Sequence, residues 1–477
     1  MKQKLVFFFP WHEVSGGPYY LTRLANSIVK TGKYDVYYTD YRYGLSDSLI
    51  ADPNIKVLEY HDEGKKFSIF PEEPVILVMP IYWAFMVPHM HPNSKIVFFN
   101  WHNECIPCLK RDWYLSNRGV AAFLSLVKQT SSVFFCDKAH WMAQSAEGVA
   151  FKETYVPIVI PERKTRAVKK LAVEKERKIA IMGRLCIDKV YSVLDVIDNI
   201  VALRDQKATT IYLIGDGDQN YRILERTYPS HIKVEGCGTM RMEKIIPMLA
   251  KKVDILFAMG TSVLDGASIG LPAVVIPNSM QEFHCNRYPY LYETCGYALG
   301  WYPNQIDDMG IETHTIEEIF DDIYIRGKKA EIGERCLNYY RANHTQNVAL
   351  FQEAIQSSTL TYDRFREFGC PRDFQFAKML IQKSSFRLRL ALGNPYKRLT
   401  ILGIPVFSIR FRPPQYYNLI ICGIPLLRIN KTASTFSIHL LFIVWVAKLL
   451  KKGLALAFKT KRIYKNKCGR SCDKGKL

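Results

Sequence analysis

Three segments decide the fold of this chain: KIAIMGR (residues 178–184), TIYLIGDG (210–217) and VDILFAMGTS (253–262). Each is a short apolar run that leads into a glycine-containing turn, and helical stretches separate the three. Short apolar runs that alternate with helices are typical of a parallel α/β sheet. Ligands bind to such sheets at the carboxyl ends of the strands, where all three turns lie. Residues 178–277 therefore predict a Rossmann-like ligand-binding domain.

Positive charge is expected at the same edge of the sheet. Arg184 ends the first segment, and Lys189 follows five residues later. Two cations at the mouth of a parallel sheet suit a diphosphate, since each can offset the charge of one phosphoryl group.

The turn after the third segment predicts the start of a helix. We expect Ser262 to cap this helix, with Asp265 three residues later in a short capping box, and the helix to stop at Gly270. Gly260 and Thr261 would then present free backbone N–H groups at a helix N-terminus, which favour an anion.

The order and spacing of these turns, together with the segment LDGASIGLP (264–272), resemble the nucleotide-sugar-binding half of GT-B glycosyltransferases over about a hundred residues. The nearest group is the retaining family 4 type, which builds bacterial polysaccharides, lipopolysaccharides and glycolipids. The resemblance implies that Arg184 and Lys189 hold the donor diphosphate and that Asp265 holds the ribose hydroxyls. It also implies sugar transfer that needs neither a metal ion nor another cofactor.

The sequence departs from the family at one motif. The family usually carries two glutamates eight residues apart, whereas here the second is the shorter Asp265 and the first falls on Phe257. The sequence therefore does not identify the donor sugar or the base of the nucleotide. Turn and helix-start residues are expected to line the donor site: Gly16, Gly17, Gly183, Gly215, Gly260, Thr261, Ser262, Leu264 and Asp265.

The N-terminal half predicts a second α/β domain. An apolar run at 5–9, the glycine pair Gly16-Gly17, a helical stretch at 19–30 and a run at 35–39 form a βαβ opening. The glycine pair is either a plain tight turn or, as the resemblance implies, a loop that approaches the donor phosphates.

Further strands are expected at 75–79 and 95–99, and the second leads into His102. The resemblance makes His102 a catalytic candidate beside the donor sugar, although a single histidine in an aromatic setting is often structural. Weaker candidates for the acceptor side are His12, Glu13 and Glu104, and His140 is expected to be structural.

The fold predicted from these patterns is α/β of the GT-B type, with two Rossmann-like domains facing a cleft and a C-terminal basic appendage. Residues 1–165 form the acceptor-side domain, and residues 166–370 form the nucleotide-sugar-binding domain with a late helix at 344–357. Residues 371–477 form the appendage. Residues 155–166, an extended apolar run with two prolines followed by charged residues, serve as the linker.

The chain has 477 residues and a net charge of +20, and the excess charge has one location. Residues 371–477 hold 22 Lys and Arg but two acids, which leaves 43 basic and 43 acidic residues for residues 1–370. The twelve cysteines show no metal-binding framework, because the pairs Cys105–Cys108 and Cys468–Cys472 are far apart. Asp216-x-Asp218 is interpreted as turn chemistry rather than a metal motif. We therefore expect no metal site.

The basic tail predicts membrane association. Two Gly-Ile-Pro segments, centred on Pro405 and Pro425, each suggest a strand–turn–strand. The apolar run at 436–447 is shorter than the roughly 20 residues that span a bilayer, and basic residues follow it, so it is expected to form an interfacial helix. Residues 431–477 are thus predicted to bind an anionic membrane surface rather than nucleic acid, with a buried packing helix as the alternative.

The function predicted is transfer of a sugar from a nucleotide-diphosphate-sugar to a glycan or glycolipid acceptor, at the cytoplasmic face of the plasma membrane. Two alternatives remain. A GT-B nucleotide-sugar epimerase would keep the fold but would have no use for the basic tail. A non-catalytic GT-B-like scaffold subunit would explain the missing first glutamate.

Overall fold

The computed structural model describes residues 2–11, 16–42, 44, 46–60, 67–102, 104–107, 109, 117–145, 148–167 and 176–368, together with strand segments between 389 and 440. The chain divides into two compact units, residues 1–371 and residues 372–477.

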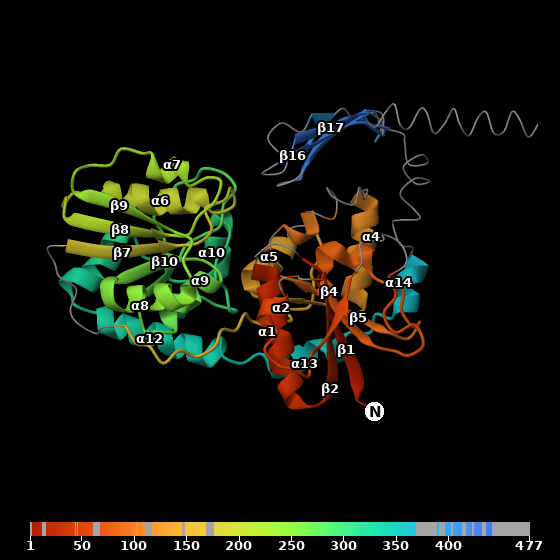
Figure 1. Cartoon of the computed structure of the whole chain (residues 1–477). Coiled ribbons are helices and arrows are strands. Elements are labelled where there is room, and N and C mark those ends of the chain that lie inside the picture. The colour runs from red at the N-terminus through yellow and green to blue at the C-terminus, as the bar shows by residue number, and fades with distance from the viewer. Residues whose placement is uncertain are drawn as a thin grey trace, which may run out of the picture. The chain divides into compact units, whose positions relative to one another are not determined.

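The first unit begins with a six-stranded parallel sheet of order β3-β2-β1-β4-β5-β6 (Figure 1). Its strands are β1 (Gln3–Phe8), β2 (Tyr34–Asp40), β3 (Lys56–Glu59), β4 (Ile76–Pro80), β5 (Lys95–Asn100) and β6 (Val133–Phe135). Its helices are α1 (Gly16–Ile28), α2 (Ser46–Leu49), α4 (Asn117–Gln129) and α5 (Lys138–Ser145). The four strands expected from the apolar runs are present. Helix α1 starts at Gly16 rather than Tyr19, so the glycine pair belongs to its first turn.

Aromatic side chains pack helices onto both faces of this sheet. On one face, Phe7 of β1 stacks on Phe351 of α13 (Val348–Ser357), with 5.8 Å between ring centroids. On the other face, Phe98 of β5 contacts Phe123 of α4 at 5.7 Å and Phe365 of α14 (Tyr362–Phe368) at 6.3 Å. Helices α13 and α14 come from the end of the unit, so residues beyond 347 complete the core of the first sheet.

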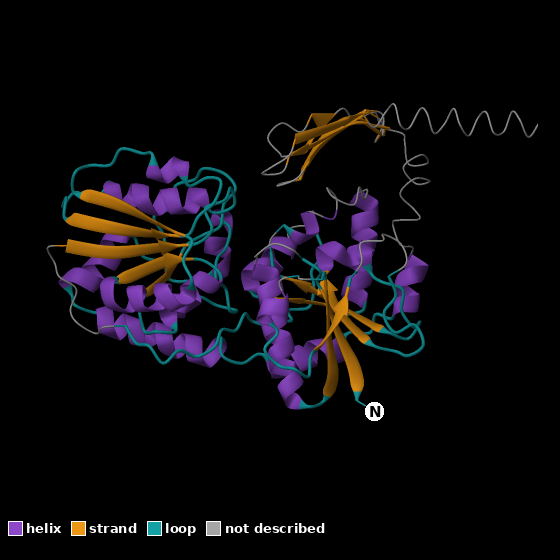
Figure 2. Ribbon diagram, in the orientation of Figure 1, coloured by secondary structure: helices purple, strands orange, loops and turns teal. Residues whose placement is uncertain are grey.

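The second parallel sheet has five strands in the order β11-β10-β7-β8-β9. They are β7 (Glu176–Met182), β8 (Ala208–Ile214), β9 (Ile232–Gly238), β10 (Ile255–Ala258) and β11 (Ala273–Val275). Helix α6 (Val190–Val201) covers one face, and α8 (Met242–Lys252) and α12 (Lys329–Asn343) cover the other (Figures 1 and 2). Because β7 pairs with β10, the turns after these two strands lie side by side at the point where the strand order reverses.

Shorter elements complete the second half of the unit: α7 (Tyr221–Leu224), α9 (Thr261–Ala267), α10 (Ile306–Met309), α11 (Ile316–Phe320) and a π-helical turn (Asp321–Ile325). Strands β7, β8 and β10 correspond to the three segments that predicted this domain. Two Rossmann-like parallel sheets in tandem confirm the predicted α/β class and give the arrangement typical of GT-B enzymes.

The second unit contains an antiparallel sheet whose strands follow chain order. They are β12 (Arg389–Leu390), β13 (Tyr396–Ile401), β14 (Ile404–Arg412), β15 (Tyr416–Ile421), β16 (Ile424–Lys431) and β17 (Phe436–Leu440). The two Gly-Ile-Pro segments give the expected strand pairs, β13–β14 and β15–β16. The register shifts at Leu399/Thr400 in the first pair and at Leu419/Ile420 in the second, twenty residues apart.

The expected interfacial helix is wrong for its first residues. Phe436–Leu440 forms β17 and pairs with β16. The sequence FSIHL alternates apolar and polar residues, a period of two that suits a strand better than a helix. The rest of the predicted helix, and residues 441–477 as a whole, lie outside the described residues. Within the described part of the chain, no helix combines the length and apolar character that crossing a bilayer requires.

The α13 packing predicts the effect of one truncation. Phe351 is completely buried and contacts Phe7 and Phe134, so Phe351→Ala should leave a cavity in the core of the first sheet and lower the free energy of unfolding by about 3–5 kcal/mol. Urea denaturation measures this loss. Glu353→Ala, an exposed position on the same helix, is the control and should change stability by less than about 0.5 kcal/mol. Equal stability of the two variants would contradict the packing.

Candidate functional site

The turns after β7 and β8 are in direct backbone contact. The Leu185 N–H donates to the Asp216 carbonyl at 3.0 Å, and the Gly183 N–H donates to the Ile214 carbonyl at 3.0 Å. Gly215 has a φ of +132°, and a Cβ there would lie 2.0 Å from the Gly183 carbonyl oxygen. Position 215 therefore requires glycine for packing, a structural reason that stands apart from any contact with a ligand.

This contact fixes the segment that carries the two predicted cations. Arg184 is exposed, while Lys189 is half-buried and forms the N-cap of α6 without a side-chain cap. Between them lies Asp188, which accepts a hydrogen bond from the Cys186 thiol at 2.5 Å. Burial opposes ionisation of Asp188, but this hydrogen bond and the charges of Lys189 and Arg184 lower its carboxyl pKa.

His102, from the other half of the unit, joins this group. Burial is the main cause that lowers its pKa to about 4, and His140, Lys189 and Arg184 add to the shift while Asp188 opposes it. His102, Arg184 and Lys189, the three residues predicted to be catalytic, thus lie near enough for the two cations to act on the histidine. A histidine with this pKa is neutral at physiological pH.

The tautomer of His102 follows from its hydrogen bond. The Glu104 backbone N–H donates to His102 Nδ1 at 3.1 Å, so Nδ1 is an acceptor and a neutral ring carries its proton on Nε2. His102 can therefore donate a hydrogen bond from Nε2 to a bound oxygen. It is poorly suited to act as a general base, because the nitrogen that is free of a proton is already engaged.

His140, expected to be structural, is paired with a buried carboxylate. Its Nδ1 lies 2.6 Å from Asp137 Oδ1, and its backbone N–H donates to the same oxygen at 2.9 Å. Asp137 is 1% exposed. The pair fixes the start of α5, and its electrostatic effect on His102 places it beside the candidate site.

The expected capping of α9 is wrong. The N-cap is Gly260, whose φ of +61° is accessible mainly to glycine, and Ser262 lies inside the first turn after Thr261. The Gly260 N–H donates to the Leu299 carbonyl at 2.6 Å and is therefore not free for an anion. The side chain of Leu264 is fully buried in the core of the second sheet, so only its backbone could contact a donor.

Asp265 does not complete a capping box either. Its carboxylate Oδ1 accepts a hydrogen bond from Arg163 Nη2 at 2.6 Å. Burial raises the Asp265 pKa, and Arg163 and Arg23 act against that shift. The residue predicted to hold ribose hydroxyls is thus already paired with an arginine of the linker.

The structure also shows the surroundings of the glycine pair and of Glu104, one of the acceptor-side candidates. A Cβ at Gly17 would lie 2.7 Å from Phe9 and 2.8 Å from Trp101, whereas Gly16 has no atoms within 4 Å of that position. Glu104 accepts a hydrogen bond from the Tyr302 hydroxyl at 3.0 Å. His12 and Glu13 lie outside the described residues.

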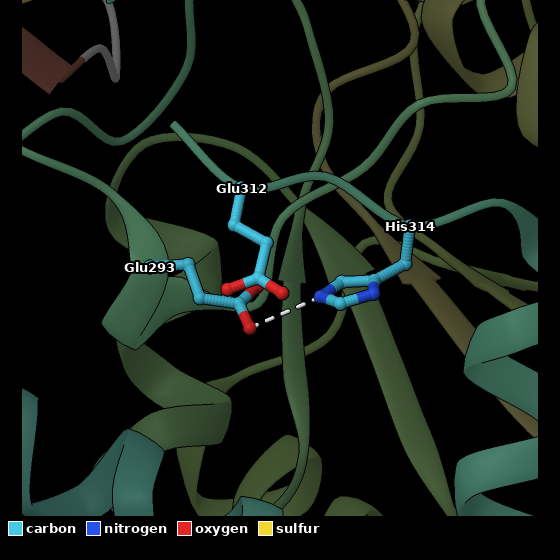
Figure 3. Close-up of side chains that lie close together, drawn as sticks. All are labelled: Glu293, Glu312 and His314. Carbon is cyan, nitrogen blue, oxygen red and sulfur yellow. Dashed lines mark hydrogen bonds and ion pairs between the residues drawn. The ribbon is translucent and has the colours of Figure 1, made fainter. Parts of the chain in front are cut away.

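One group of side chains in the described part of the chain has metal-ligand chemistry. Glu293, Glu312 and His314 place their ligand atoms within 4.8 Å of one another (Figure 3). His314 Nε2 lies 3.0 Å from Glu293 Oε1, and this hydrogen bond is the main cause of a raised His314 pKa. His314 and Glu293 are therefore partners of each other within the protein.

The Asp216-x-Asp218 segment has the hydrogen bond of a turn. The Asp216 carboxylate accepts a hydrogen bond from the Gly217 N–H at 2.8 Å, as expected of turn chemistry.

Sequence reasoning missed Asp188, Arg163 and Arg23. Asp188 lies inside the segment that was already singled out, so its acidic side chain between the two cations was available as a signal. Arg163 and Arg23 carry no local motif, and their proximity to Asp265 appears only in the folded chain.

Comparisons with known proteins give similarities to solved structures alone. No family model matches the sequence, and no curated protein matches it. A structure of HepE (Alr3699) from Anabaena in complex with UDP and glucose is 13% identical, with 74% of this chain and 99% of that chain covered and a TM-score of 0.45. The lipopolysaccharide outer core galactosyltransferase WaaB, in apo form, is 12% identical, with 74% and 99% covered and a TM-score of 0.47.

A glycosyltransferase from Rickettsia africae is 12% identical, with 77% of this chain and 98% of that chain covered and a TM-score of 0.46. At these identities and TM-scores, the similarity alone assigns no activity to this chain.

The neutral His102 predicts a pH effect on stability. Its folded pKa of about 4 lies below the unfolded value of about 6.5, so the unfolded chain binds the proton more readily. The stability of the wild-type protein should therefore fall, relative to His102→Gln, as the pH drops from about 6.5 to 4, and the difference should then level off. Urea denaturation across this range measures it, and a constant difference would show that the His102 pKa is not lowered.

Proposed function

We propose that this chain is a glycosyltransferase that moves a sugar from a nucleotide-diphosphate-sugar to a lipid-linked glycan acceptor in bacterial surface polysaccharide or lipopolysaccharide biosynthesis. The observation that carries the proposal is the convergence of Arg184, Lys189 and a neutral His102 at the carboxyl ends of parallel strands from two Rossmann-like sheets. Two cations and an N–H donor at one place suit a group that gains negative charge as a bond breaks.

The reaction requires little proton chemistry from the protein. The bond between the sugar C1 and the diphosphate oxygen breaks, the acceptor hydroxyl oxygen bonds to C1, and the hydroxyl proton leaves with the nucleoside diphosphate. Arg184 and Lys189 would offset the charge that develops on the departing diphosphate, and His102 Nε2–H would donate a hydrogen bond on the sugar side. The two cations can meet this need without a metal ion. Retention of configuration at C1 follows from the family resemblance.

The nucleoside is proposed to lie next to Asp265. This carboxylate keeps Oδ2 for the ribose hydroxyls while Oδ1 is bonded to Arg163. Asp265 lies in α9, directly after β10, and β10 pairs with β7, so the ribose and diphosphate sites would occupy neighbouring strand ends. The pattern supports one elongated donor site along the switch point of the second sheet.

Arg184→Ala tests the phosphate assignment. Removal of one charge that stabilises the leaving group should lower the rate of nucleoside diphosphate release by at least about 100-fold. Release is measured with purified protein and a panel of UDP-, GDP- and CMP-linked sugars. Arg204→Ala, an exposed arginine in the turn after α6, removes the same charge at a distance from the site and should retain full activity.

The same assay separates the alternatives. An epimerase would convert one sugar nucleotide into another without releasing diphosphate, and a scaffold subunit would turn over none of the panel. Unchanged turnover by Arg184→Ala would refute the role of this residue in holding the diphosphate.

We further propose that the protein works at the inner face of the plasma membrane. Residues 431–477 carry twelve Lys and Arg against one acid. Each basic residue near an anionic surface contributes about 1 kcal/mol at most, so a few suffice for peripheral binding.

Vesicle co-sedimentation tests this placement. The full chain should sediment with vesicles of phosphatidylcholine and phosphatidylglycerol and should be released as salt is raised, because the attraction is electrostatic. Vesicles of phosphatidylcholine alone are the control. Equal binding to both kinds of vesicle would contradict a role for the basic tail.

A further inference from the structure

Two arginines and one carboxylate form a charged cluster that the proposed chemistry does not yet use. Arg163 of the linker donates to Asp265 of α9 at 2.6 Å. Arg23 of α1 interacts electrostatically with both, and its guanidinium lies 5.6 Å from the ring centroid of Tyr19. The cluster thus joins the first helix of the chain to the helix after β10. Arg163 is hydrogen-bonded to the carboxylate and Arg23 interacts with it through its charge alone, so the three side chains carry one positive charge in excess.

The same two arginines have unsatisfied donors. Arg23 Nη1 and Arg163 Nε are both covered from solvent and have no hydrogen-bond partner among the residues that the structure describes. A covered N–H group without an acceptor costs free energy, and more so on a charged side chain. Burial also lowers the pKa of Arg23, so its surroundings disfavour the charge that it carries. These two covered nitrogens are closed to a ligand in this conformation, so a bound anion would contact the other N–H groups of the two arginines and would offset the excess positive charge.

We propose that Arg23 and Arg163 form a second oxyanion-binding pair, which takes the phosphate nearest the nucleoside in a bound nucleotide. This inference rests on the proposed function, in which Asp265 holds the ribose hydroxyls. The first phosphate of a nucleotide is attached to the ribose, so it must lie close to whatever holds the sugar. Guanidinium groups that already contact or face Asp265 are placed to receive it.

The chemistry favours a phosphoryl group. The planar guanidinium offers N–H donors in a fork that matches two oxygens of a phosphate, and a phosphate near two arginines and one carboxylate would leave the cluster close to neutral. The donor site would then divide its work: Arg23 and Arg163 hold the phosphate next to the ribose, while Arg184 and Lys189 hold the phosphate next to the transferred sugar.

Titration calorimetry with matched ligands tests this division. The full chain is titrated with uridine, UMP and UDP, with guanosine, GMP and GDP, and with inorganic phosphate. Arg23→Gln should weaken the monophosphate and the diphosphate of the bound series alike, by roughly tenfold, and leave the nucleoside unchanged. Arg184→Ala should weaken the diphosphate far more than the monophosphate.

Two further variants serve as controls. Arg204→Gln removes one positive charge from an exposed position and should bind every ligand as the wild type does, which excludes an effect of net charge. Arg23→Lys keeps the charge but loses the fork, and should restore only part of the affinity. Thermal unfolding of each variant confirms that it is folded.

Each result has a distinct meaning. If Arg23→Gln binds the monophosphate as tightly as the wild type, the cluster is an ion pair only and the inference is wrong, while the Arg184 result still decides the proposed function. If the wild type binds inorganic phosphate but no nucleotide, and Arg23→Gln loses that binding, the oxyanion pair stands and the proposed function fails. Wild-type protein that binds neither nucleotides nor phosphate overturns both.

Discussion

Backbone contact between the turns after β7 and β8 is the constraint on which the candidate site depends. Arg184, Lys189 and His102 cannot hold one another in place, because two of them repel and the third is kept neutral by burial and by their charges. The backbone must therefore hold these residues in position. It does so through main-chain groups: Leu185 donates to Asp216, and Gln219 donates to Leu185, both at 3.0 Å. Gly215 allows the two turns to approach this closely.

Positive charge is distributed unevenly along the chain. Residues 1–370 are neutral as a whole, yet they concentrate cations at the strand ends of the second sheet and around Asp265. The excess of positive charge lies in residues 371–477, apart from the candidate site in sequence. A diffuse basic surface favours attraction to an extended polyanion, whereas a few oriented cations with defined partners favour one small ligand. Both distributions of charge occur in this chain, in separate parts of its sequence.

The sequence predicted the fold more completely than the site. Apolar runs ending in glycine located β7, β8 and β10, because burial on both faces of a parallel strand leaves a continuous hydrophobic pattern. The sequence could place the cations Arg184 and Lys189 at the end of a strand because both follow the first apolar run closely. The role of Ser262 was misjudged because a glycine with positive φ begins α9, and backbone conformation leaves no trace in side-chain spacing. The Arg163–Asp265 pair spans 102 residues, and no local pattern can reveal it.

The packing of α13 and α14 on the first sheet has a consequence for folding during translation. Phe351, Leu360 and Phe365 belong to the same buried core as β1, so that core stays incomplete until roughly three-quarters of the chain has left the ribosome. The domain with the second sheet must leave the ribosome, and can fold, before the core of the first domain is complete. Nascent chains of this protein therefore leave aromatic side chains of the first sheet uncovered during much of translation.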